Sequence, residues 1–309
     1  MASSFSRMCA LVEGGSIRII ELQAVPRSMS TALGRCLNES RATSVFINEP
    51  FNVQQNDVDV AAAHVIRSLA SLLPSASEPV IVVTKNMARF LSAPVFRTWT
   101  DVCGALVWCI RDPRLQISSL VTRTVNDLLF GIGSDRLAQH DLLPSHLVMA
   151  TDFLQNSQWS TNFSKTGWRA IGEHFTDLAG RRPSFVADGS LFSHRPDLFL
   201  RCLCNGLGIE FRDPMIDGWS EPFLNVNRLL SPDLADSADA WIKHAATSHG
   251  VEANDHVPLD MSVLPDALRD HLFEVALPTY EMFVRAFCSQ ERLARYGLAV
   301  SDGPPLCWP

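Results

Sequence analysis

A strand-like segment that leads directly into a helix N-terminus lies near the start of the chain. Residues 19–25 are mostly apolar, and Pro26-Arg27 ends the run. A polar turn follows, in which Ser28, Ser30 and Thr31 carry hydroxyl side chains that favour helix N-termini and Met29 lies between them. This order predicts a parallel α/β protein with an anion site. The helix dipole, the unpaired backbone N–H groups of the first turn and the charge of Arg27 all converge there.

Short apolar strands alternate with longer helical patterns along the chain. We expect strands over 18–23, 44–47, 79–84, 104–110 and 184–187, and helices over 31–40, 58–73, 87–100, 115–130, 158–179, 196–207 and 264–295. The pattern predicts a three-layer α/β sandwich with a central parallel sheet of about five strands. No linker divides the sequence. We therefore expect one domain over 1–309, with a core at 18–212 and a helical or irregular cover at 213–309.

Composition restricts the partners of such a protein. Of the 309 residues 47% are hydrophobic and 19% charged, which is typical of a globular chain, and the net charge is −7. With no Lys/Arg run, we expect no nucleic-acid partner and a local basic pocket. No apolar stretch reaches the roughly 18 residues of a membrane span, and no signal peptide is visible. Eight scattered cysteines and no His/Asp/Glu cluster with metal spacing favour a reduced, cytoplasmic protein without a metal.

A second basic segment follows the fourth expected strand. The apolar run 104–110 ends at Arg111, and Pro113 suits the first turn of a helix. Arg27 and Arg111 both follow carboxyl ends of strands, the edge at which open parallel sheets bind ligands. Ser119 lies eight residues after Arg111, about two helical turns on, and therefore faces the same edge.

These two segments together resemble the sulfotransferases that use 3′-phosphoadenosine 5′-phosphosulfate (PAPS). The run Pro26-Arg27-Ser28-Met29-Ser30-Thr31 is similar to their 5′-phosphosulfate loop, in the Pro-Arg-Ser variant familiar from tyrosylprotein and bacterial members. Arg111 to Arg114 with Ser119 resembles their 3′-phosphate segment, and 190–211 resembles a helix after their last core strand. The resemblance spans about 18–212. It implies a P-loop NTPase-like sulfotransferase fold, PAPS as cofactor and 3′,5′-adenosine bisphosphate as product.

The resemblance also implies catalytic residues. Glu49 follows the strand 44–47 at a separation from Arg27 similar to that of the catalytic glutamate of tyrosylprotein sulfotransferases, so we expect it to be the general base. A solvated acid in a turn is the alternative. Cytosolic members have Lys-Thr-His where this chain has Lys85-Asn86-Met87, so the usual histidine is missing. Lys85 and Arg27 then remain as cations for the sulfuryl group or the bridging oxygen; for Lys85 a surface position is the alternative.

Four further features stay open at this point. Arg123 is in reach of the 3′-phosphate but is interpreted as a helix-surface arginine. Asp188-Gly189-Ser190 either positions loops or binds the acceptor, or is a plain turn. Met87 and residues 126–154 are expected to shape the acceptor pocket. The family's C-terminal Lys-Gly-rich loop is not recognisable, and Arg228 or Lys243 are its candidate substitutes.

The leading hypothesis is a sulfotransferase that moves a sulfuryl group from PAPS to a hydroxyl or amine of a small-molecule acceptor, for example in natural-product modification. A P-loop-type small-molecule kinase is the first alternative. It is disfavoured because no glycine lies between Ala24 and Leu33 and no Gly-x-x-x-x-Gly-Lys-Ser/Thr loop is present. A non-catalytic nucleotide-binding relative is the second. The sequence leaves a monomer and a homodimer both open.

Overall fold

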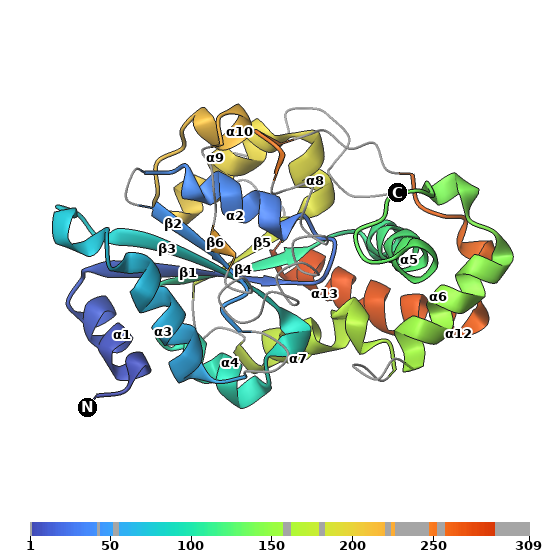
Figure 1. Cartoon of the computed structure of the whole chain (residues 1–309), viewed down its shortest axis with the longest axis horizontal. Coiled ribbons are helices and arrows are strands. Elements are labelled where there is room, and N and C mark those ends of the chain that lie inside the picture. The colour runs from blue at the N-terminus through green and yellow to red at the C-terminus, as the bar shows by residue number, and fades with distance from the viewer. Residues whose placement is uncertain are drawn as a thin grey trace.

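A single parallel sheet organises the protein. The computed structural model describes residues 2–41, 44–51, 56–156, 162–178, 183–219, 224–225, 247–251 and 257–287. Within these ranges the strand order is β5-β4-β1-β3-β2-β6, and every neighbouring pair is parallel (Figure 1). The strands are β1 Ile17–Ala24, β2 Ser44–Asn48, β3 Val80–Met87, β4 Ala105–Ile110, β5 Ser184–Asp188 and β6 Leu224–Asn225. The predicted α/β class with a central parallel sheet is confirmed, and β6 extends that sheet by a short edge strand.

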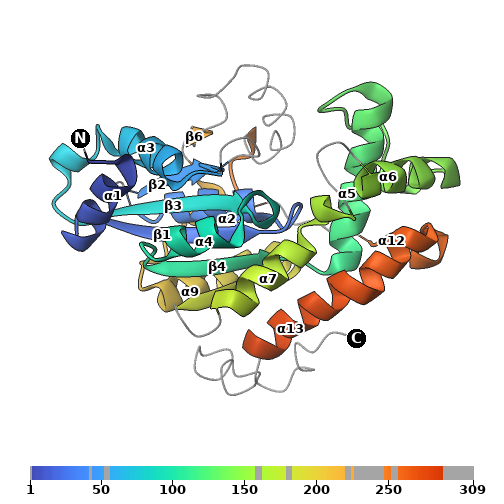
Figure 2. The same cartoon turned by 90° about the horizontal axis from the view of Figure 1, so that it is seen from below.

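Helices cover both faces of the sheet (Figure 1). One face carries α2 Ser30–Asn38, α8 Gly189–His194, α9 Pro196–Leu207 and α10 Pro214–Asp217. The other carries α1 Ser4–Glu13, α3 Val58–Leu69, α4 Ala93–Thr100 and α7 Trp168–Leu178. Beyond the carboxyl ends of the strands lie α5 Pro113–Phe130, α6 Pro144–Asn156 and α12 Asp266–His271, and α13 Leu277–Phe287 runs back along the sheet (Figure 2). Single turns fill the connections: η1 Leu73–Ser75, η2 Ala88–Phe90, η3 Gln139–Asp141, η4 Ser164–Thr166, η6 Met261–Val263 and the π-helical η7 Leu272–Ala276.

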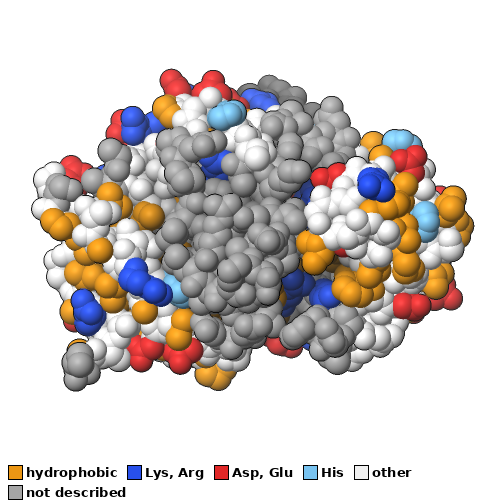
Figure 3. All heavy atoms as spheres, viewed as in Figure 1, with side chains coloured by type: hydrophobic (Ala, Val, Ile, Leu, Met, Phe, Trp, Pro, Cys, Tyr) orange, Lys and Arg blue, Asp and Glu red, His pale blue; other side chains and the backbone are white. Residues whose placement is uncertain are grey.

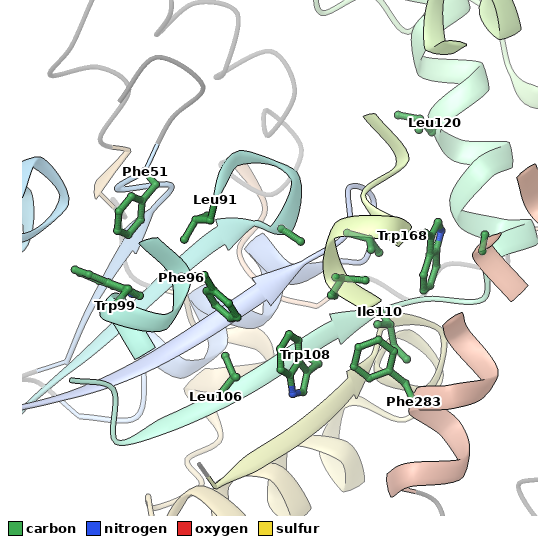
Figure 4. Close-up of a cluster of buried hydrophobic side chains, with 14 of the residues drawn as sticks. Phe51, Leu91, Phe96, Trp99, Leu106, Trp108, Ile110, Leu120, Trp168 and Phe283 are labelled. Atoms are coloured by element: carbon green, nitrogen blue, oxygen red, sulfur yellow. The ribbon is translucent and has the colours of Figure 1, made fainter. Parts of the chain in front are cut away.

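Large aromatic side chains join the sheet to the helices on the α7 face. Trp108 of β4 packs edge-on against Phe96 of α4 with ring centroids 5.9 Å apart, and its centroid lies 5.6 Å from that of Phe283 in α13 (Figure 4). The same cluster continues to Met8 of α1 and Leu147 of α6. Each such buried side chain contributes about 2 kcal/mol relative to an exposed one. The elements beyond the strand ends are therefore attached to the sheet by continuous apolar packing.

Two helix predictions were wrong in their extent. The segment 87–100 was expected to be one helix, but β3 continues through Met87, which pairs with Ala24 of β1, and α4 begins only at Ala93. Strand pairing outweighs local helix propensity here. The helix expected over 158–179 begins at Trp168 because Gly167 adopts a φ of +80°. Residues 157–161, 288–295 and most of 220–256 lie outside the described residues, and α1 and α6 had not been expected.

The strand order places the chain's two basic segments side by side. Ala24, at the end of β1, pairs with Cys109 near the end of β4. The chain leaves β1 through α2 on one face and passes from β4 to β5 through α7 on the opposite face. A parallel sheet opens a crevice where neighbouring strands send their connections to opposite faces. The loops after β1 and β4 flank this position.

Candidate active site

The loop after β1 has a strained backbone. Arg27 and Met29 have φ angles of 63° and 62°, in the left-handed region that L-residues rarely adopt. Each such residue costs about 1–3 kcal/mol, which functional sites often tolerate. The Ser28 hydroxyl donates to the Val25 carbonyl oxygen at 2.7 Å and closes the loop. The loop leads directly into the N-terminus of α2, the positive end of the helix dipole. Met29, the N-cap residue, gives this end no side-chain hydrogen bond, as suits a helix end that binds an anion.

Three predicted phosphate ligands come together from three elements. Arg27 Nε donates to Ser119 Oγ, 3.0 Å away in the second turn of α5. Arg111, directly after β4, directs Nη1 toward the carbonyl oxygen of Arg27 at 3.4 Å. The loop 26–31 and the segment 111–119, predicted to bind the two phosphates, therefore lie side by side.

Two buried polar atoms at this site have no hydrogen-bond partner among the described residues. Arg111 is only 4% exposed, and its Nε has no hydrogen-bond partner among the described residues. Burial lowers the pKa of this guanidinium. The Ser190 hydroxyl is likewise buried without a partner in the described part of the chain. Buried donors are normally paired, and a ligand with acceptor oxygens would satisfy these two.

The turn after β5 packs against the 5′-loop. A Cβ added to Gly189 would lie 2.5 Å from the Ser28 carbonyl oxygen, closer than real contacts. Asp188 accepts hydrogen bonds from the Ser190 N–H at 2.8 Å and the Tyr280 hydroxyl at 2.6 Å. Only glycine at position 189 lets this turn support the loop, so the segment is more than a plain turn.

Arginines and aspartates lie close together at the site. Burial, together with the charges of Arg123 and Arg111, lowers the pKa of Arg27 to about 10; the charges of Asp135 and Asp127 oppose this shift. Arg123 is 7% exposed and pairs with Asp127 at 3.0 Å and Asp135 at 3.1 Å. The interpretation of Arg123 as a helix-surface residue was wrong, because α6 and η3 pack against α5 and enclose it. Carboxylates act on Arg111 as well, since the charges of Asp188 and Asp112 raise its pKa against the effect of burial.

Lys85 and Glu49 form a buried ion pair at the same edge. Lys85 lies within β3 rather than after it, on the sheet face that α2 covers, and its side chain is fully buried. Its Nζ donates to Glu49 Oε1 at 2.5 Å, and the Glu49 side chain is 13% exposed. The Glu49 N–H donates to the Lys85 carbonyl oxygen at 2.7 Å, and Glu49 has a φ of 53°. Neither a surface lysine nor a solvated acid describes this pair.

A buried polar network holds the turn that carries Glu49. Glu21, in the middle of β1, accepts hydrogen bonds from Thr84 Oγ1 at 2.5 Å, Asn86 Nδ2 at 3.0 Å and Trp99 Nε1 at 3.0 Å. Asn86 Oδ1 in turn accepts from the Phe51 N–H at 3.2 Å. Burial raises the pKa of Glu21 to about 7. Sequence reasoning missed this network, although an acid inside an apolar strand was a visible signal.

Arg89 lies close enough to Glu49 for the charge of that carboxylate to act on it, and Lys165 lies close to Arg89. Arg89, in η2 directly after β3, donates from Nη1 to the Lys165 carbonyl oxygen at 2.9 Å. Lys165 of η4 holds its Nζ 3.6 Å from the ring centroid of Phe153 in α6. Strand-end reasoning would have found Arg89, four residues after Lys85, but no sequence signal pointed to Lys165.

The remaining predicted site regions are less well defined. Met87 is half-buried, and the stretch 126–154 exposes apolar side chains at the α5–α6 end, where hydrophobic atoms gather in Figure 3. Arg228 and Lys243 lie outside the described residues. Within the described ranges no cluster of His, Cys, Asp and Glu has metal-binding geometry. No helix in the same ranges is long and apolar enough to cross a membrane.

The fold and the site define an α/β protein with a strained, arginine-bearing loop at the carboxyl edge of a parallel sheet. No protein-family model and no curated protein matches the sequence. Among solved structures the chain is similar to the sulfotransferase domain from the curacin biosynthetic pathway, with 15% identity over 84% of this chain and 97% of that chain and a TM-score of 0.42. It is also similar to a sulfotransferase from Alicyclobacillus acidocaldarius, with 14% identity over 73% of this chain and 94% of that chain and a TM-score of 0.42. A third similar structure is the sulfotransferase domain from the Synechococcus PCC 7002 olefin synthase, with 12% identity over 87% of this chain and 95% of that chain and a TM-score of 0.41.

Proposed function

We propose that this chain is a sulfotransferase that moves a sulfuryl group from PAPS to a hydroxyl or amine of a small-molecule acceptor. The observation that carries the proposal is the convergence of Arg27, Arg111 and Ser119, with the buried Arg111 Nε lacking a partner in the described residues. A nucleotide phosphorylated at both the 5′ and 3′ positions has the two separate anionic ends that such a site suits.

The donor would be held by residues from two loops. Arg27, Ser28, Met29, Ser30 and Thr31, with the N-terminus of α2, would hold the 5′-phosphosulfate. Arg111 Nε and the Ser119 hydroxyl are suited to the 3′-phosphate, because a phosphate oxygen would satisfy the orphaned Nε. PAPS brings the sulfuryl group to be transferred and leaves as 3′,5′-adenosine bisphosphate.

Transfer needs a base and a cation at the reacting end. In the proposed reaction Glu49 takes the proton of the acceptor while the acceptor oxygen or nitrogen forms its bond to sulfur. The bond from sulfur to the bridging oxygen breaks, and that oxygen keeps the electron pair on the departing 5′-phosphate. Lys85 and Arg27 would stabilise this negative charge. Because both cations are already in position, the site would not need to reorganise during the reaction.

A kinase is the competing function. The left-handed φ angles of Arg27 and Met29 are conformations that glycine usually supplies in nucleotide loops, so the missing glycines alone do not decide the question. The missing P-loop lysine, and the pairing of Lys85 with Glu49 rather than with a loop, speak against ATP.

Thermal stabilisation separates the two functions. We expect 3′,5′-adenosine bisphosphate at a hundred times its dissociation constant to stabilise the fold by about 2.7 kcal/mol, with ATP and Mg²⁺ producing little change. Stabilisation by ATP with Mg²⁺ and none by the bisphosphate would exclude the sulfotransferase.

A further inference from the structure

Arg89 and Lys165 are held in place by the protein, yet no described residue neutralises them. Neither forms an ion pair with a carboxylate in the described ranges, and Arg89 Nε is buried with no hydrogen-bond partner there. Arg89 is fixed through its Nη1 to the Lys165 carbonyl oxygen, and Lys165 through the face of Phe153. The charged groups of both side chains are thus already held in position by the protein.

The surrounding charges do not compensate this pair. Glu49 is the carboxylate whose charge acts on Arg89, but it already pairs with Lys85 at 2.5 Å. Burial lowers the pKa of Arg89 to about 10, and burial together with the charge of Arg89 lowers the pKa of Lys165 to about 8. Desolvated cations without a counter-charge are costly, and such costs are typical of binding sites for anions.

The strand order separates Arg89 from Arg111, one of the residues proposed to hold the donor. Lys165 lies beside Thr166, whose carbonyl oxygen shares Gln116 Nε2 with that of Pro26, so η4 lies next to the loop after β1. Arg111 follows β4 and Arg27 follows β1, whereas Arg89 follows β3, and Glu49 follows β2. The strand order β4-β1-β3-β2 puts Arg89 on the Glu49 side of the edge, away from Arg111. The acceptor must approach Glu49 for its proton to be removed.

We propose that Arg89 and Lys165 bind an anionic group of the acceptor, a carboxylate, phosphate or sulfate, so that the acceptor is an acidic molecule. Its nucleophilic hydroxyl or amine would then be held beside Glu49. This inference rests on the proposed function and names the substrate class of the same site.

Protection of Lys165 from a neutral amine reagent tests the anion site without needing turnover. With saturating 3′,5′-adenosine bisphosphate, acetic anhydride at pH 8 should modify Lys165, and peptide mass spectrometry reports the extent. We expect inorganic phosphate and sulfate to slow this modification at least about fivefold, while glycerol does not. The proposal would be overturned if neither anion, at a concentration 50 times that of the bisphosphate, slowed the acetylation of Lys165. It would also be overturned if glycerol slowed the acetylation as much as the anions do.

Charge variants link the site to specificity. Lys165→Met keeps the apolar stem over Phe153 and should weaken phosphate binding about tenfold, while Lys165→Arg should retain it. Arg41→Met, which removes an exposed arginine paired with Glu78 at the opposite end of β2, is the matched control. A loss of bisphosphate affinity of tenfold or more in Lys165→Met would mean that the pair holds the donor, and would overturn the proposal.

Matched acceptors complete the test. We expect 4-hydroxyphenylacetate to be sulfated with kcat/KM about tenfold or more above 4-hydroxyphenylacetamide, mainly through KM, and Lys165→Met to remove this preference. Equal kcat/KM for the two probes contradicts the proposal. If the bisphosphate fails to bind at all, the proposed function fails, whereas phosphate protection of Lys165 without nucleotide still reports on the anion site.

Discussion

Lys85 and Glu49 are joined twice, by the Nζ–Oε1 contact of 2.5 Å and by the Glu49 N–H donating to the Lys85 carbonyl oxygen at 2.7 Å. The two contacts fix a carboxylate in a left-handed turn next to a fully buried ammonium. Asn86 holds the other side of the turn through the Phe51 N–H. A base on a turn this well fixed would need little reorganisation before it accepts a proton.

Replacing Glu49 by glutamine tests the base directly. Glu49→Gln keeps a hydrogen-bond acceptor for Lys85 but not a proton acceptor, so sulfuryl transfer should fall by about 10²- to 10⁴-fold. Calorimetry should find the affinity for 3′,5′-adenosine bisphosphate nearly unchanged. Glu78→Gln, at an exposed acid paired with Arg41, is the control. Unchanged turnover in Glu49→Gln would rule out the base.

Arg111 should distinguish nucleotides by their 3′-phosphate. Arg111→Met removes the guanidinium whose Nε lacks a partner, so 3′,5′-adenosine bisphosphate should bind about tenfold or more weakly. Adenosine 5′-monophosphate lacks the 3′-phosphate, and its affinity should change little. Titration calorimetry of both nucleotides with both proteins gives the coupling between Arg111 and the 3′-phosphate. Equal losses for the two nucleotides would place Arg111 elsewhere in the site.

Gly189 should be necessary for the shape of the 5′-loop. In Gly189→Ala the new methyl group would meet the Ser28 carbonyl oxygen at 2.5 Å, and displacing that backbone costs about 1–3 kcal/mol. We expect a lower urea midpoint and at least about tenfold weaker bisphosphate binding. Gly172→Ala in α7, where the methyl would meet only the Thr279 side chain, is the control. Binding that is the same in Gly189→Ala and the control would separate this turn from the site.

Glu21 should make stability depend on pH. Its pKa is raised from 4.5 to about 7 by burial, so the folded protein binds this proton more tightly than the unfolded chain does. Its contribution is therefore fully present below about pH 4.5 and is lost as pH rises to about 7, a change of about 3 kcal/mol. Urea unfolding between pH 5 and 8 should give a difference curve between wild type and Glu21→Gln that slopes in this sense. A flat difference curve would mean that Glu21 does not take up a proton on folding.

The sequence predicted local features of the structure better than contacts between distant parts of the chain. The strand–turn–helix order around Arg27 and the carboxyl-end rule were enough to predict the parallel sheet and the meeting of Arg27, Arg111 and Ser119. Both depend on short-range patterns and on a topology with few alternatives.

Contacts between distant elements were beyond such patterns. Sequence reasoning placed Arg123 on the surface because it considered only the residues near it within α5. Asp135 and α6, which bury Arg123, come later in the chain. Lys165 lies near Arg89 only because η4 packs there, and no local pattern encodes that packing. The end of β3 was misplaced because its last residues pair with β1.

Transfer of the labelled group tests the central claim most directly. Purified protein is incubated with ³⁵S-labelled PAPS, or with γ-³²P-labelled ATP and Mg²⁺, and a panel of small alcohols, phenols and amines, including acidic members. We predict that ³⁵S appears in an acceptor and in stoichiometric balance with 3′,5′-adenosine bisphosphate, and that ³²P is not transferred. Transfer of ³²P, with ³⁵S remaining in PAPS for every acceptor, would contradict the assignment of this site to sulfuryl transfer.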